Sequence, residues 1–173
     1  MNRRKSKSRT RRAVLPNGFT LMELLIVMAI ITILMLLAIP SFTALKKRGN
    51  HLSAIKSIQA IQEAETMYAS NYPTFGYACS LPALGGESSA GAPSPTAAQF
   101  LKADITSGFK DGYIFAITNC TKVSASGTDR ITSYNITAVP QTIGKTGDSG
   151  YCADDSSIKS DPAGGTNCTQ LVQ

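Results

Sequence analysis

The sequence predicts an α+β protein in which a long N-terminal helix packs on a small antiparallel β-sheet head. An apolar run followed by a helical pattern of apolar residues over positions 19–72, and alternating apolar and polar residues after position 112, predict this class. The length of 173 residues allows one ordinary domain and an extra segment. We expect a basic leader at 1–18, an apolar helix at 19–45, its amphipathic continuation at 46–72 and the head at 73–173.

The leader carries the excess of positive charge. The formal net charge is +6, yet seven basic residues and no acid precede Gly18, and the remainder holds ten Lys and Arg against eleven Asp and Glu. A dense basic block directly before an apolar run is typical of the cytoplasmic flank of a membrane segment. A basic arm for nucleic acid is the weaker alternative, and we do not expect nucleic acid as a partner.

The apolar run extends from Leu24 to Leu45, which is 22 residues without a charge. As a helix it would be roughly 33 Å long, enough to cross a bilayer. Lys46, Lys47 and Arg48 follow it, but the denser leader favours an orientation with the leader in the cytoplasm. Pro40 lies inside the run and predicts a kink, because proline removes a helical hydrogen bond.

The helix is predicted to continue beyond the run to about Asn71. Apolar residues follow a helical spacing, with polar residues between them, and Pro73 disfavours helix at the residue before it. The predicted apolar stripe comprises Leu52, Ile55, Ile58, Ile61, Ala64 and Tyr68, and Lys56, Gln59, Gln62, Glu63 and Glu65 lie between its members.

The head is predicted to begin with a long loop and to continue as strands. Residues 73–111 are expected to hold one brief helix, capped by Thr96 and carrying Phe100 and Leu101. Alternation predicts two strands, one from Tyr113 to Cys120 and one around Tyr134–Ala138, joined by a turn between Ser124 and Asp129. Further strands are expected near Gly150–Ala153 and Ser157–Lys159.

The four cysteines, Cys79, Cys120, Cys152 and Cys168, all follow the apolar run. No two of them form a C-x-x-C pair and the chain has one histidine, so a zinc site is poorly supported. Their number and position indicate disulfides in an oxidising compartment such as the periplasm. Three pairings are open, and we favour Cys79–Cys120 with Cys152–Cys168; free buried thiols are the alternative.

The sequence predicts neither an enzyme nor a cofactor or metal site. No nucleophile motif, phosphate loop or metal-ligand spacing is present. His51 follows a basic cluster, and we expect it at a solvated position. Asp154, Asp155 and Asp161 are candidate calcium ligands, although their spacing differs from an EF-hand and solvated loop carboxylates are the ordinary interpretation.

Glu23 is the unusual residue, because it is a carboxylate directly ahead of a membrane-length apolar run. A cut after Gly18 would place a new amine at Phe19, one helical turn away. Within one helix the Phe19 amine and the Glu23 carboxylate are poorly oriented for contact with each other. Between two offset helices the carboxylate of one can meet the amine of the other, and both charges would otherwise face hydrocarbon unpaired.

The string GFTLMELL, with the apolar run and Pro40 behind it, is similar to the N-terminal signature of class III type IV prepilins and pseudopilins. The resemblance covers about residues 12–48; Met22 stands where the family often has Ile. It implies that a membrane prepilin peptidase cleaves between Gly18 and Phe19 and methylates the Phe19 amine. It also implies that Glu23 guides subunit addition and that Pro40 bends the helix.

The resemblance implies a pilin-like fold and a structural subunit of a type IV pilus or related filament. The expected partners are other copies in a helical homopolymer, the peptidase, the pilus or secretion assembly machinery and the cytoplasmic membrane. The precursor would reside in a bacterial inner membrane and later in a periplasm-spanning or cell-surface filament. A type II secretion pseudopilin, a single-pass membrane-anchored periplasmic binding module and a conventional signal peptide are the alternatives. Adhesion, motility, DNA uptake and secretion all stay open as roles.

Overall fold

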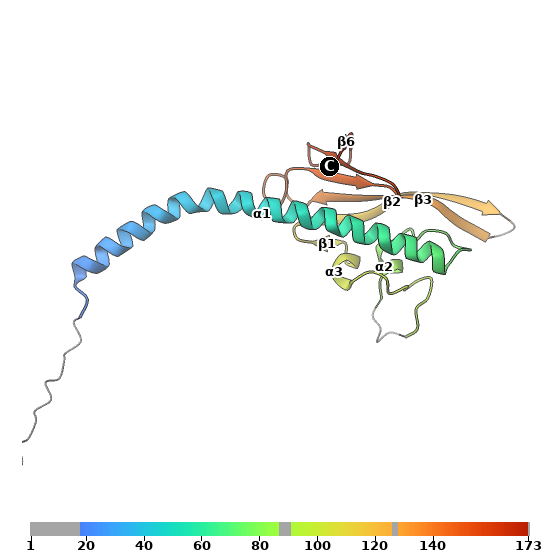
Figure 1. Cartoon of the computed structure of the whole chain (residues 1–173), viewed down its shortest axis with the longest axis horizontal. Coiled ribbons are helices and arrows are strands. Elements are labelled where there is room, and N and C mark those ends of the chain that lie inside the picture. The colour runs from blue at the N-terminus through green and yellow to red at the C-terminus, as the bar shows by residue number, and fades with distance from the viewer. Residues whose placement is uncertain (1–17, 87–90, 126–127, 173) are drawn as a thin grey trace, which may run out of the picture. The chain divides into compact units, whose positions relative to one another are not determined.

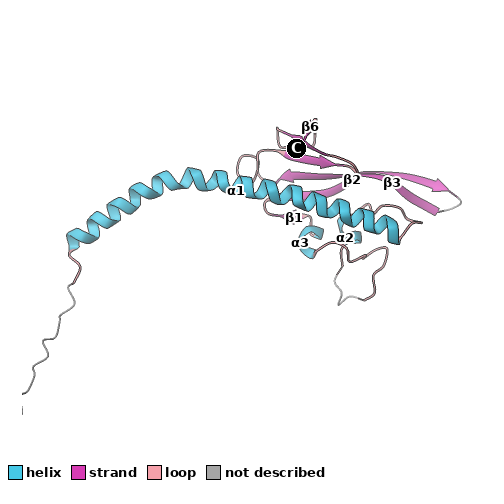
Figure 2. Ribbon diagram, viewed as in Figure 1, coloured by secondary structure: helices cyan, strands magenta, loops and turns pink. Residues whose placement is uncertain are grey.

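The computed structural model describes residues 18–86, 91–125 and 128–172, and the side chains of residues 37–41, 125 and 128 lie outside this description. The fold is α+β, with an N-terminal helix and a six-stranded antiparallel sheet, so the predicted class is confirmed (Figures 1 and 2). The chain divides into two compact units, and the division along the sequence falls between Ile39 and Pro40. Residues 1–17, which make up all of the expected leader except Gly18, lie outside the described residues, so the leader stays a prediction.

Helix α1 comprises Leu21–Asn71, 51 residues. It ends where the sequence predicts, since Pro73 has no backbone N–H and disfavours helix at the preceding position. The backbone N–H of Tyr72 still donates to the carbonyl of Tyr68 at 2.8 Å and closes the last turn. The bend expected at Pro40 falls at the boundary of the two units, among residues whose side chains are not described, and it stays a prediction.

The second half of α1 packs on the sheet and on the loops of the head. Its buried apolar residues are Ala54, Ile58, Ile61, Ala64 and Tyr68, which largely follow the predicted stripe. The prediction that Leu52 belongs to the buried stripe is wrong, because this residue is 58% exposed. Two polar residues on the same helix, Ser57 and Glu65, are buried, which the pattern did not predict.

The sheet has the order β1-β2-β3-β4-β5-β6, so every strand pairs with its sequence neighbour. Such a meander needs only short connections. The strands are β1 (Phe109–Lys110), β2 (Tyr113–Ala125), β3 (Thr128–Pro140), β4 (Gly150–Ala153), β5 (Ile158–Asp161) and β6 (Gln170–Leu171). The four predicted strands are present, β4 with the predicted bounds and the other three with shifted ends, and the two-residue edge strands β1 and β6 were not predicted.

The β2–β3 hairpin is longer than predicted. Ser124 pairs with Asp129 and Ala125 with Thr128, so the two strands are separated by residues 126 and 127 alone, which lie outside the described residues. The register shifts between Thr118 and Thr121, where Asn119 has a φ of 50°. This irregularity explains why the alternating pattern stops near Cys120 although the strand continues.

The prediction of a helix that begins at Thr96 is wrong. Residues 94–97 form a turn, in which Ser94 and Ala97 exchange backbone hydrogen bonds of 3.1 and 3.0 Å, and the segment after it hydrogen-bonds the backbone of residues 83–85. The short helices of this loop are α2 (Leu81–Leu84) and α3 (Ala103–Thr106). Pairing with another segment of backbone thus replaces the expected helix.

Candidate functional site

The segment from Gly18 to Glu23 forms the start of α1. The backbone N–H of Glu23 donates to Thr20 Oγ1 at 3.2 Å, and the backbone N–H of Thr20 donates to Glu23 Oε2 at 3.3 Å. This reciprocal arrangement is a capping box, which satisfies backbone N–H groups that a helix start leaves unpaired. The T-x-x-E spacing is the sequence signal of this local role, which was not among the predictions. Within one chain, Glu23 therefore stabilises the helix start.

Gly18 and Phe19 lie directly before this cap and are exposed. The Phe19 side chain is 83% exposed, and a Cβ placed on Gly18 would meet no atom within 4 Å. Nothing in the described part of the chain therefore requires glycine at position 18. The peptide bond between these two residues is accessible to another protein.

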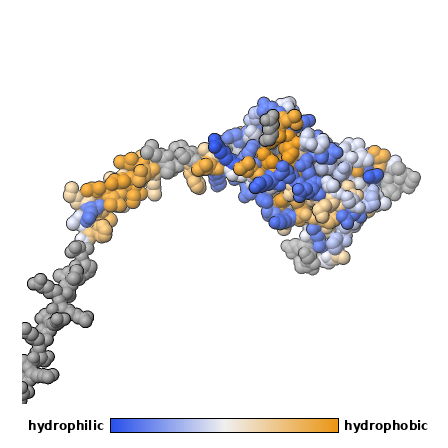
Figure 3. Space-filling view, viewed as in Figure 1, coloured by the Kyte–Doolittle hydropathy of each residue, from blue (hydrophilic) through white to orange (hydrophobic). Residues whose placement is uncertain are grey.

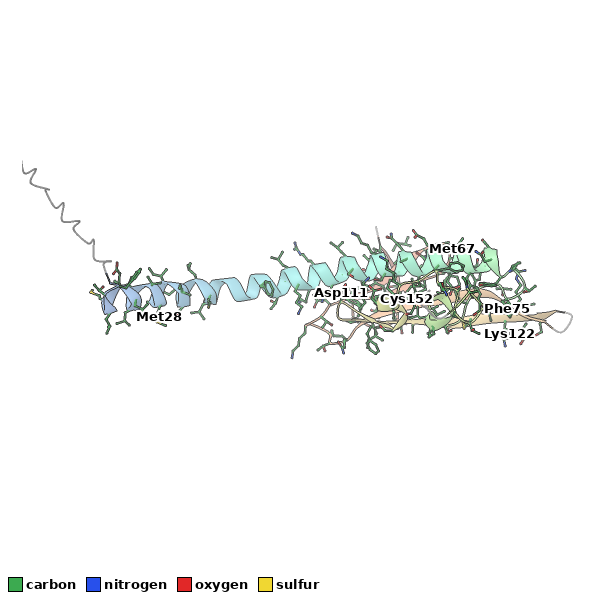
Figure 4. The ribbon with its side chains drawn as sticks, turned by 90° about the horizontal axis from the view of Figure 1, so that it is seen from below. Met28, Met67, Phe75, Asp111, Lys122 and Cys152 are labelled. Atoms are coloured by element: carbon green, nitrogen blue, oxygen red, sulfur yellow. A yellow bond between two sulfur atoms is a disulfide. The ribbon has the colours of Figure 1, made fainter. Side chains whose placement is uncertain are left out.

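The first unit presents apolar side chains all round the helix. Every described residue from Phe19 to Leu36 is exposed, and nearly all of them are apolar (Figure 3). Met28, for example, projects from the helix with 61% of its surface exposed (Figure 4). A helix that is apolar on all sides is normally covered by lipid or by other protein.

The structure also bears on membrane crossing. Over the described residues, no helix combines the length and the apolar character that a bilayer span requires.

The head contains a hydrogen-bonded cluster where α1 meets the sheet. Nδ1 of His51 lies in hydrogen-bond contact with the hydroxyl of Tyr151, and the hydroxyl of Tyr113 donates to the carbonyl of Ser149 at 3.0 Å. Burial raises the pKa of both tyrosines. His51 is half-buried and engaged, so the expectation of a solvated position was wrong.

Glu65 is the buried acid of the head. It is fully buried on α1, where its Oε2 accepts a hydrogen bond from the backbone N–H of Ala78. Its Oε1 has no partner within the described residues. Sequence reasoning placed Glu65 among the polar residues between the apolar positions; only the packing of the 72–79 segment against α1 buries it.

The cysteines form two disulfides, Cys79–Cys120 and Cys152–Cys168, which are the pairs that the sequence analysis favoured. The first joins the loop after α1 to strand β2, and the second joins strand β4 to the C-terminal segment. They fix the two long irregular segments of the head to the sheet.

Two of the three candidate calcium ligands, Asp154 and Asp161, accept hydrogen bonds within their own loops. Asp154 Oδ1 accepts from the backbone N–H groups of Ser156 and Ser157, and the oxygens of Asp161 accept from those of Ala163 and Asn167. Among the described residues, no three His, Cys, Asp or Glu side chains are placed to hold a metal ion.

The comparisons with known proteins agree with the N-terminal geometry. Residues 16–39 match the prokaryotic N-terminal methylation motif, the class III prepilin signature, which supports a type IV pilin-like protein. The signature suggests a membrane-anchored precursor and a setting that includes a peptidase and pilus assembly, and the proteins that carry it are generally structural. No curated protein and no solved structure matches the chain.

Proposed function

We propose that the chain is the precursor of a filament subunit of a type IV pilus or a related filament. In this proposal a prepilin peptidase hydrolyses the peptide bond between Gly18 and Phe19 and methylates the new amine. The apolar helix anchors the precursor in the inner membrane until copies join through their N-terminal helices. Head-to-tail association of this kind is heterologous and open, which produces filaments instead of closed rings.

The observation that carries this proposal is the methylation motif at residues 16–39. This segment contains the exposed Gly18–Phe19 peptide bond and the exposed apolar part of α1 that follows it. The side chains of residues 19–36 are exposed, so we expect lipid or other copies to cover them. A binding module needs an anchor, but it needs neither the glycine before the helix nor Glu23 at its start.

Glu23 supplies the proposed contact between copies. Its Oε2 accepts the Thr20 hydrogen bonds, and no hydrogen bond to Oε1 is found within the described residues. The carboxylate can therefore retain its cap and still receive the charged Phe19 amine of a neighbouring copy. Such a charge-assisted contact is strong in an apolar environment, because neither charge can be left unpaired there.

Intact-mass measurement of the mature chain from its native host tests the processing step. We expect a chain that begins at Phe19 and is about 14 Da heavier than the unmodified sequence, the mass of one added methyl group. A mature chain that begins elsewhere would contradict the proposal.

The variant Gly18→Val tests recognition of the cleavage site. Because a Cβ at position 18 meets no described atom within 4 Å, we expect the variant to fold, and a loss of cleavage would then reflect recognition by the peptidase. Gly49→Val is the matched control, since Gly49 also has nothing within 4 Å of its Cβ position and should be processed normally. Normal filaments from the Gly18→Val variant would refute the assignment.

A deletion strain separates the pilus from the secretion pseudopilus. Loss of long surface filaments with intact protein export supports a pilus subunit. Loss of export with intact surface filaments supports the pseudopilin alternative.

A further inference from the structure

A cluster of cationic side chains begins where the apolar run ends. Leu45 closes the run, and Lys46, Lys47 and Arg48 follow it without interruption on α1. In the membrane-anchored precursor that we propose, these residues would lie at the level of the lipid headgroups. The inference below rests on that anchoring.

A cavity of about 340 Å³ opens beside this cluster. Its wall includes Ala44, which still belongs to the apolar run, so the cavity adjoins the surface that lipid chains would cover. Lys47, Arg48 and His51 face it from one side of α1, and Tyr113, Asp148 and Tyr151 complete the wall from the sheet and the loop before β4. The volume is suitable for a small polar headgroup.

The charges in the cavity wall leave a net attraction for an anion. Lys47 Nζ and Asp148 Oδ2 form an ion pair at 2.9 Å, which compensates the one carboxylate of the wall. Arg48 is exposed and forms no ion pair with any described carboxylate. Its guanidinium therefore presents uncompensated charge with a donor geometry that matches phosphate oxygens.

His51 adds a second donor. Its Nδ1 is occupied by the Tyr151 hydroxyl, whereas no hydrogen bond from Nε2 is found within the described residues. When the hydroxyl donates to Nδ1, the ring proton lies on Nε2 and is available to a ligand. The ring itself is held in place by the edge contact with Tyr151, with centroids 5.2 Å apart.

We propose that this cavity binds the phosphate of an anionic phospholipid headgroup, held by Arg48 and His51. The group that Arg48 and His51 would recognise is a phosphate oxygen, which a lipid headgroup and free phosphate have in common. The lipid is favoured because the cavity adjoins the end of the apolar run. A zwitterionic headgroup is not favoured, because Lys47 already holds the carboxylate that would attract its ammonium group.

The test is native mass spectrometry of the full chain released from an uncharged detergent, with phosphatidylglycerol, phosphatidylcholine or inorganic phosphate added. We expect retained phosphatidylglycerol well above phosphatidylcholine, and Arg48→Gln to lower the retained fraction about fivefold. Lys56→Gln is the matched control. Lys56 is an exposed lysine on the same helix and outside the cavity, so this variant should retain phosphatidylglycerol unchanged. Because the basic leader is the same in every variant, its own attraction for the lipid cancels.

Equal retention of the two lipids, or equal loss in the Arg48→Gln and Lys56→Gln variants, would overturn the inference. If inorganic phosphate displaced phosphatidylglycerol at equal concentration, the cavity would be a site for free phosphate, and the proposal of a lipid ligand would be wrong. The measurement needs no filament. A chain that binds the lipid through Arg48 but is never cleaved at Gly18 would contradict the proposed function alone.

Discussion

The backbone N–H of Ala78 donates a hydrogen bond of 2.7 Å to Oε2 of Glu65. This bond joins the C-terminal part of α1 to the segment that carries Cys79, in the interior of the head. Burial raises the pKa of Glu65 to about 8, although the Ala78 hydrogen bond acts in the opposite direction. The head therefore holds a carboxylic acid that is mostly protonated at neutral pH.

The stability of the head should fall as the pH rises from about 4.5 to about 8. In this window the folded head retains the Glu65 proton while the unfolded chain, with a pKa near 4.5, has lost it, so unfolding is increasingly favoured. The slope is at most about 1.4 kcal/mol per pH unit, and it vanishes above the folded pKa. All six tyrosines lie between Tyr68 and Tyr151, so their fluorescence during urea unfolding reports the head.

Glu65→Gln is the control for this slope. Its amide oxygen can still accept from Ala78, but it does not titrate. Tyr68 and Tyr134 face the same acid, and burial raises their pKa values, so they stay neutral in this window. The lowered pKa values of Asp104, Asp129 and Asp154 place their titrations below it. An unchanged slope in Glu65→Gln would show that another group is responsible.

The two disulfides should differ in their effect on stability. Cys79 and Cys120 are 41 residues apart, and Cys152 and Cys168 are 16 apart. In the chain-entropy treatment the longer loop contributes about 4 kcal/mol and the shorter about 3 kcal/mol. Urea unfolding of the two double-alanine variants measures this difference. A larger loss from the Cys152–Cys168 variant would mean that native contacts, and not loop length, decide the order.

The sequence predicted the elements whose signals are local. Pro73 ends α1 at Asn71 as expected, and the regular alternation around Tyr113 and Tyr134 marks the two long strands. The methylation signature from Gly18 to Glu23 is equally local, because it consists of adjacent residues. These features depend on neighbours in the chain, so a single sequence contains them.

The features that the sequence did not predict depend on tertiary packing. The segment expected to form a helix after Thr96 instead pairs with the backbone of residues 83–85. Glu65 is buried only because the 72–79 segment folds back on α1, and His51 is engaged only because Tyr151 lies opposite it, 100 positions later. No pattern within a short window reports such distant partners.

Gly150 should tolerate no side chain. A Cβ there would lie 1.9 Å from the carbonyl oxygen of Gly165, so the backbone itself would have to move. We expect Gly150→Ala to destabilise the head by about 2 kcal/mol or more. Gly49→Ala is the matched control on α1. It meets nothing and should stabilise by about 0.5–1 kcal/mol, because glycine weakens a helix interior. Equal unfolding midpoints for both variants would contradict this account.

Two substitutions at Glu23 separate its two roles. Glutamine can retain the capping box with Thr20 but carries no charge, whereas alanine removes both the cap and the charge. If Glu23 acts between copies through its charge, both variants should be cleaved at Gly18 and both should assemble poorly. If its role is only to cap α1, glutamine should restore assembly and alanine should lower the stability of the helix start by about 1 kcal/mol. Filament yield by electron microscopy, measured beside the mature mass of each variant, distinguishes the outcomes. Wild-type filaments from Glu23→Gln would remove the charge from the assembly mechanism and leave the cap as the reason for this residue.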